Sequence, residues 1–136
     1  MAASLYIVVE GEDPGFDTFV KGHAMARNED ALERLAVSLQ ARPLLEYFSA
    51  DENSMALLLE QGAGEPGWAR HLPQPQWFDA LDGLHTVMTL IDFLVESPAA
   101  LGSETSPVLA ELREYERVLS KSAERSLRWH IAVSWR

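Results

Sequence analysis

The chain has 136 residues, 47% of them hydrophobic and 24% charged, a composition typical of one globular domain that we expect to span residues 1–136. Its net charge of −10 argues against general nucleic-acid binding, because phosphate contacts depend on Lys and Arg side chains. The absence of Cys excludes disulfides, thiolate metal sites and a cysteine nucleophile.

The first segment predicts a short core strand. Residues 5–10 (LYIVVE) are mostly β-branched or aromatic and apolar on both faces, and Gly11 ends the run. The residues before Glu10 lack the basic region of a signal peptide, and there is no stretch of about 20 apolar residues for a membrane span. We therefore expect a cytoplasmic protein without membrane contact.

A turn rich in Gly, Pro and Asp follows this strand and brings four carboxylates close together in the sequence. Such a cluster suits a binding surface for a basic partner. It also suits a cation site, although its spacing does not match a calcium loop. The alternative is a solvated loop, with Phe16, Phe19 and Val20 tucked onto the core. The candidate partner-binding residues are Glu10, Glu12, Asp13 and Asp17.

Two helices are expected next. The first covers residues 28–40, with Asn28 as its N-cap. Residues 44–48 follow a helix-breaking proline and form either a small strand or an irregular packing segment, and a second helix is predicted over residues 51–61. The apolar face of the first helix consists of Leu32, Leu35, Ala36 and Leu39.

Residues 61–76 form the longest segment without a periodic pattern, and loops of this length tend to be functional or disordered. The glycines in it have the formal spacing of a dinucleotide fingerprint, but they follow a helix instead of a strand. Trp68, His71 and Trp77 are candidates for lining a pocket or a partner surface. The alternative is that Trp68 covers the next helix.

Residues 77–97 predict the longest and most apolar helix, around which the other elements are expected to pack. Asp79 is placed to cap it, and Asp82 lies in its positively polarised first turn. The apolar residues expected on one face are Leu84, Val87, Met88, Ile91, Leu94 and Val95.

A polar strip on the same helix is the nearest thing to a ligand site. Asp82, His85 and Asp92 are one or two turns apart, so they suit a ligand or an acid/base pair if another segment closes over them. Trp68 and His71 of the preceding loop are the candidates for closing that site. The alternative is a helix face in water. The full strip is Asp82, His85, Thr89, Asp92 and Glu96.

The last helix is predicted to begin near Pro107, which suits the first helical position after a capping Ser106. Its expected core stripe is Val108, Leu112, Tyr115 and Leu119. Cations at four-residue steps cover its opposite side, an arrangement of like charges that needs relief from elsewhere. This basic row is Arg113, Arg117, Lys121 and Arg125.

Residues 127–135 alternate between apolar and polar side chains, which is the strongest strand signal in the chain. The order of a strand, several helices and a strand is that of an α+β domain. We expect a small antiparallel sheet that pairs the N-terminal and C-terminal strands and packs against about four helices.

Three pieces, GFDTFV at residues 15–20, WFDALDGL at 77–84 and LRWHIAVSW at 127–135, together resemble a group of short bacterial proteins of uncharacterised function. The resemblance carries no activity and no active-site residue. It implies a small stand-alone cytoplasmic protein.

No catalytic residues, metal ligands or cofactors are predicted, because the four histidines are scattered and no nucleophile elbow or P-loop is present. Charge is unevenly distributed. Residues 1–60 carry 11 acidic and 4 basic side chains, a net of −7, whereas residues 111–136 carry 4 acidic and 6 basic, a net of +2. The acidic half is expected to meet a basic partner, or the two halves meet each other within one chain or across a dimer.

The sequence therefore leaves two main hypotheses. The leading one is a small acidic, non-enzymatic interaction module, for example an immunity-type or regulatory protein that binds a basic partner. The alternative is a small-molecule or metal-binding protein, with enzymatic activity left open, that uses the strip of residues 77–97 with the 61–76 loop. A homodimer joined through exposed Trp residues is a third hypothesis.

Overall fold

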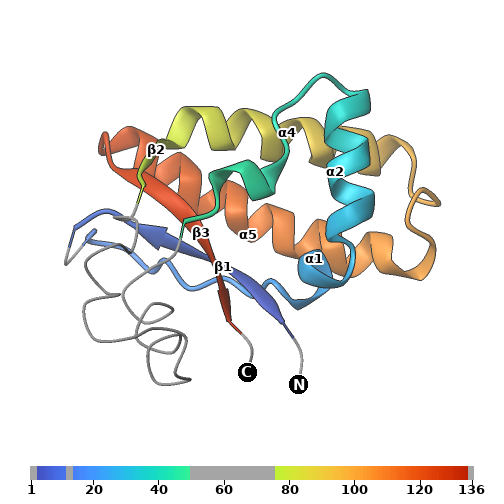
Figure 1. Ribbon diagram of the computed structural model, residues 1–136, viewed down its shortest axis with the longest axis horizontal. Helices are drawn as coiled ribbons and strands as arrows, with labels where there is room; N and C mark the ends of the chain where they lie inside the picture. Colours follow the sequence, from blue (N-terminus) through green and yellow to red (C-terminus); the bar gives the residue numbers. More distant parts are fainter. Residues whose placement is uncertain (1–2, 12–13, 50–75, 135–136) are drawn as a thin grey trace, which may run out of the picture.

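The computed structural model describes residues 3–11, 14–49 and 76–134 (Figure 1). It confirms the predicted α+β class, with four helices among these residues and a small antiparallel sheet that joins the two ends of the chain. The described elements are β1 (Ser4–Val9), α1 (His23–Arg27), α2 (Glu29–Ser38), the 3₁₀ turn η1 (Leu44–Tyr47), β2 (Phe78–Asp79), α4 (Ala80–Glu96), the 3₁₀ turn η3 (Gly102–Glu104), α5 (Thr105–Glu124) and β3 (Arg128–Ser134).

The C-terminal strand β3 is the centre of the sheet, whose strand order is β1-β3-β2. Both neighbours run antiparallel to it, and Trp129 stands opposite Val9 of β1 and Phe78 of β2. The sequence predicted one polar face for this strand, but His130 and Ala132 are buried as deeply as their apolar neighbours. The reason is its central position: Trp77 packs against the His130 ring with 4.8 Å between ring centroids.

Residues 44–48, which the sequence left open, form a 3₁₀ turn followed by a single bridge. Leu44–Tyr47 is the turn η1, and Phe48 then forms an isolated parallel bridge with Ile131 of β3. Tyr47 is buried and stacks on Trp129 with ring centroids 5.0 Å apart. The segment therefore packs against the sheet without adding a strand to it.

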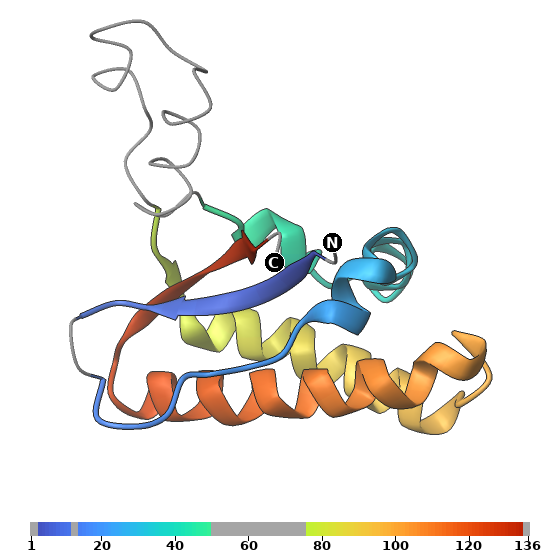
Figure 2. The same ribbon diagram turned by 90° about the horizontal axis from the view of Figure 1, so that it is seen from below.

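The two long helices α4 and α5 lie side by side against one face of the sheet (Figure 2). The predicted core stripe of α5 is confirmed, since Val108, Leu112, Tyr115 and Leu119 are all buried. The Tyr115 hydroxyl donates a hydrogen bond of 2.7 Å to the Leu5 carbonyl, which ties α5 to β1. Among the described residues, no helix is long and apolar enough to cross a membrane.

Gly83 sets the distance between α4 and the sheet. A Cβ atom at this position would lie 2.1 Å from Cζ2 of Trp129, so only glycine allows the helix to approach this closely. The indole itself is fixed: it is fully buried, and its Nε1 donates to the Asp79 carbonyl at 3.2 Å. The contact between α4 and Trp129 therefore determines which residues of the helix are buried.

The prediction for the central helix was correct in its cap but wrong in its start and in its rank as the longest helix, since α4 has 17 residues and α5 has 20. The helix begins at Ala80 and not at Trp77, because Phe78 and Asp79 pair with β3 first. The Asp79 carboxylate then accepts a hydrogen bond of 2.9 Å from the backbone N–H of Leu81, as an N-cap does.

The expected apolar face of α4 was also partly wrong, because Met88 and Val95 are exposed. Gly83 rests on Trp129 and the Thr86 hydroxyl donates to the Arg42 carbonyl at 2.8 Å, which turns the helix toward a different stripe. The buried residues of α4 are Ala80, Gly83, Thr86, Val87, Leu90, Ile91 and Leu94.

Two predicted helix starts are corrected by local hydrogen bonds. The last helix begins at Thr105 and not at Pro107, and the buried Thr105 hydroxyl accepts from the Leu101 N–H at 3.0 Å. Asn28 does precede α2, but its side chain donates backward to the Ala24 carbonyl at 2.8 Å instead of capping α2. The short helix α1, which contains Ala24, was not predicted.

We expect Gly83→Ala to destabilise the fold by about 1 to 3 kcal/mol, because the added methyl overpacks the contact with Trp129. The direction is informative, since glycine to alanine within a helix otherwise stabilises by about 1 kcal/mol. Urea unfolding followed by circular dichroism measures the change. The exposed His85→Ala on the same helix serves as a control and is expected to stay within about 0.5 kcal/mol. A Gly83→Ala variant as stable as the control would contradict this packing.

Candidate functional site

The predicted acidic patch near the N-terminus is partly neutralised within the chain. Glu10 forms an ion pair with Arg128 of β3, with an Nε to Oε1 distance of 3.2 Å. This hydrogen bond lowers the pKa of the Glu10 carboxyl. Asp17 accepts a hydrogen bond of 2.9 Å from the Phe19 N–H, and Glu12 and Asp13 lie outside the described residues.

The basic row of α5 holds the segment that follows β1. Arg117 donates to the carbonyls of Asp17 and Phe19 at 2.7 and 3.2 Å, and its Nε donates to Glu114 at 2.9 Å. Arg125 lies over the Phe16 ring, 5.0 Å from its centroid. The oppositely charged halves of the sequence therefore meet within one chain, one of the arrangements that their charges suggested.

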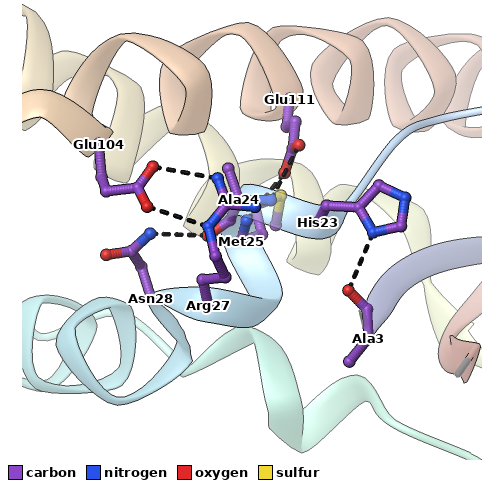
Figure 3. Close-up of polar contacts among 8 residues, drawn as sticks. All are labelled: Ala3, His23, Ala24, Met25, Arg27, Asn28, Glu104 and Glu111. Atoms are coloured by element: carbon purple, nitrogen blue, oxygen red, sulfur yellow. Dashed lines mark hydrogen bonds and ion pairs between the residues drawn. The ribbon is translucent and has the colours of Figure 1, made fainter. Parts of the chain in front are cut away.

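A cluster of polar contacts joins α1 to α5 and η3 (Figure 3). The Glu111 carboxylate accepts hydrogen bonds from the N–H groups of Ala24 and Met25, at 3.0 and 2.8 Å. Arg27 forms an ion pair with Glu104 at 3.0 Å, which lowers the pKa of the Glu104 carboxyl. Because α1 has no side-chain N-cap of its own, Glu111 supplies the acceptor that the first turn needs. This cluster is structural.

A groove of about 530 Å³ runs between residues 17–21 and α5. Two of its charged side chains are already used within the chain, since Glu111 binds the start of α1 and Arg117 binds backbone carbonyls. Phe19 is exposed on its wall, so the expectation that it packs onto the core was wrong, whereas Val20 is buried as expected. Arg117 fixes Phe19 through its carbonyl, and the side chain is left outside.

The predicted ligand strip of α4 lies on the outer surface of the helix. Asp82, His85 and Asp92 are all exposed, while Trp68 and His71 lie outside the described residues. Within the described ranges, no three His, Asp or Glu side chains are grouped to hold a metal ion. A site closed by the 61–76 loop therefore stays a prediction.

The same side of α4 carries an exposed apolar set that the sequence had partly assigned to the core. Leu81, Met88 and Val95 have exposed fractions of 61%, 46% and 51% and are spaced seven residues apart. His85 and Asp92 fall between them at three- and four-residue steps, so all five residues lie along one line of the helix. We call Leu81, His85, Met88, Asp92 and Val95 the outer face of α4.

This outer face is acidic along one edge. Asp82 and Glu96 lie along this edge, and there is no Lys or Arg anywhere between Arg70 and Arg113 in the sequence. His85 is the only basic side chain on α4. A row of exposed apolar groups bordered by carboxylates is the candidate interaction surface of the described chain.

Two of the four tryptophans that were candidates for a homodimer contact lie within the described residues. Trp129 is fully buried, and Trp77 is half-buried against His130. Trp68 and Trp135 lie outside the described residues. Neither described tryptophan therefore offers a free contact surface.

Comparisons with protein families, curated proteins and solved structures found no match to this chain.

Replacing Arg128 with Gln should raise the pKa of the Glu10 carboxyl toward the ordinary Glu value of 4.5, because the hydrogen bond from Arg128 is the largest cause of its lowering. In the native chain this pair stabilises the fold above the ordinary pKa, and its contribution disappears as pH falls through the lowered folded pKa. Carbon-13 NMR of the Glu10 carboxyl measures the titration. An Arg113→Gln variant on the exposed face of α5 is the control and should leave the Glu10 curve in place. Identical Glu10 curves for native and Arg128→Gln chains would contradict the pair.

Proposed function

We propose that this chain is a small acidic interaction module that binds a basic protein partner. The observation that carries the proposal is the outer face of α4, where exposed apolar side chains are bordered by carboxylates without a Lys or Arg between them. An immunity-type inhibitor that covers a basic enzyme, or a regulatory subunit, would have these properties. A cytoplasmic location belongs to the same proposal.

The N-terminal carboxylates support the proposal less than α4 does. Glu10 is paired with Arg128, and Asp17 lies beside Arg117, which holds its backbone carbonyl. On α4, by contrast, Asp82, Asp92 and Glu96 are exposed, and none of them has a salt bridge within the described chain. Three exposed carboxylates without a salt bridge therefore lie on α4, a helix that carries no Lys or Arg.

The groups with perturbed pKa values favour an interaction role over catalysis. Enzyme sites gather shifted acids and bases in a cleft. In the described chain the shifted carboxyls, Glu10 and Glu104, belong to exposed ion pairs. Burial raises the pKa of Tyr47 and of Tyr115, and the Tyr115 hydroxyl binds a backbone carbonyl. These groups serve the fold.

Long-range attraction adds to this argument. A net charge of −10 accelerates encounters with a cationic protein, and the effect weakens with salt because the Debye length falls from about 10 Å at 0.1 M to about 3 Å at 1 M. After the encounter, the apolar residues of α4 supply contact area that charge alone lacks. Both the charge attraction and the apolar contact are needed for a specific complex.

The test is a pull-down with the immobilised chain at low and high salt, using two variants that each remove three negative charges. Asp82→Asn, Asp92→Asn and Glu96→Gln together neutralise α4, and we expect them to abolish capture of a basic protein. Glu29→Gln, Asp30→Asn and Glu33→Gln together neutralise the three carboxylates of α2, which are also exposed, and this variant should retain capture. Equal capture by both triple variants, or a partner that is itself acidic, would contradict the proposal.

A further inference from the structure

We propose that the basic partner docks through an amphipathic helix laid along the outer face of α4. The inference rests on the proposed function and adds the shape and the chemistry of the docking element. It is carried by the spacing of the exposed residues and by the charge that borders them.

The spacing of the outer face is that of a coiled-coil seam. Leu81, Met88 and Val95 repeat every seven residues, with His85 and Asp92 at the alternate steps. At a rise of about 1.5 Å per residue, the apolar side chains are about 10 Å apart and the face is about 21 Å long. A helix of about 14 residues or more, with its own apolar residue every seven, matches that length and inserts knobs between the three side chains.

The polar positions of the seam specify the charge of the partner. Asp92 lies between Met88 and Val95, so a docked helix would remove its carboxylate from water. Removing an unpaired carboxylate from water costs several kcal/mol, so Asp92 requires a Lys or Arg opposite it. Asp82 and Glu96 lie along one edge of the seam and also favour Lys or Arg on the partner. The partner helix therefore carries cations beside its apolar stripe.

The surface is preorganised for such a partner. The opposite side of α4 is fixed by Gly83 against Trp129 and by fully buried residues such as Val87, Leu90 and Leu94. The side chains of the outer face therefore project from a helix whose backbone does not need to be ordered on binding, which lowers the entropic cost of association.

Charge also distinguishes a basic helix from a second copy of this chain. Two outer faces brought together would place Asp82, Asp92 and Glu96 of one copy near the same residues of the other. Only His85 on each α4 offers a basic group in return. Like charges at a contact oppose association, whereas a cationic helix relieves all three carboxylates.

The test uses two synthetic peptides of about 21 residues, or three heptads, with identical Leu, Lys and Ala composition. In one, Leu repeats at seam positions with Lys beside it; in the other, the same residues are shuffled so that no apolar stripe forms. Fluorescence anisotropy measures binding to the full chain. We expect the patterned peptide to bind about tenfold more tightly or better, a difference typical of a few buried anchors.

Two matched variants locate the contact. Met88→Glu places a charge at the centre of the seam and should weaken the patterned peptide about tenfold or more. Val37→Glu makes the same kind of change at another exposed apolar residue, 62% exposed on α2, and should leave its affinity within about twofold once the added charge is screened. Retained binding in Met88→Glu would overturn the docking site.

The remaining outcomes distinguish a failure of the helical docking mode from a failure of the proposed function. Equal binding of both peptides would overturn the helical seam while leaving an acidic module that binds basic partners. If neither peptide bound but the pull-down still recovered an α4-dependent basic protein, the helical mode alone would fail. Sedimentation of the chain by itself gives the third result: a dimer that Met88→Glu dissociates would replace the basic helix with a second copy.

Discussion

The contact between Gly83 and Trp129 is the constraint on which the arrangement of the other elements depends. Trp129 is in the central strand, between Val9 and Phe78 on its two neighbours. Its indole stacks on Tyr47 and donates to the Asp79 carbonyl just before α4 begins. Sheet, η1 and α4 therefore meet at one buried ring, and the absence of a side chain at Gly83 lets the helix reach it.

This contact also decides which side of α4 faces solvent. With Gly83 turned inward, Val87, Leu90 and Leu94 follow it into the core, and Leu81, Met88 and Val95 are left outside. A methyl group added at position 83 would push the helix away from the sheet. The exposure of this apolar row is therefore a consequence of how α4 packs against the sheet. Its seven-residue spacing is a property of the sequence, and two helical turns bring residues at that spacing onto nearly the same side.

The distribution of charge follows from a second feature, the return of the chain along α5. After β1, residues 14–22 run beside α5 before α1 begins (Figure 2), and Arg117 and Arg125 are used to hold them. These two cations of the C-terminal half thereby hold a segment of the N-terminal half. The carboxylates of α4 form no salt bridge in the described chain, which leaves them open to a partner.

The sequence was informative where one periodicity dominated. The pairing of the terminal strands and the stripe of α5 follow from clear patterns of two and of three to four residues. On α4 the pattern was ambiguous, because apolar residues occur on most of its sides and periodicity alone could not choose the buried one. The signal that was missed is Gly83 itself, since a glycine within a helix is costly and marks a close approach.

Other features depended on contacts too distant for a local pattern to reveal. The five residues of α1 are held by Glu111, more than 80 positions later in the chain. The helix α4 begins later than the sequence predicted because Phe78 pairs with Trp129, which also lies far away in sequence. For the candidate site, the sequence identified His85 and Asp92 on one line but assigned Met88 and Val95 to the core, so its apolar component emerged only from the packing.

Methyl NMR of methionine-labelled chain tests the central claim, that the outer face of α4 is the surface where a basic partner binds. Met88 is exposed in the middle of that face, and Met25 is fully buried beside α5 and serves as an internal reference. Titration with a lysine-rich amphipathic helix should shift or broaden the Met88 methyl signal in a saturable way while the Met25 signal stays in place. Saturable binding with an unmoved Met88 signal would contradict the account.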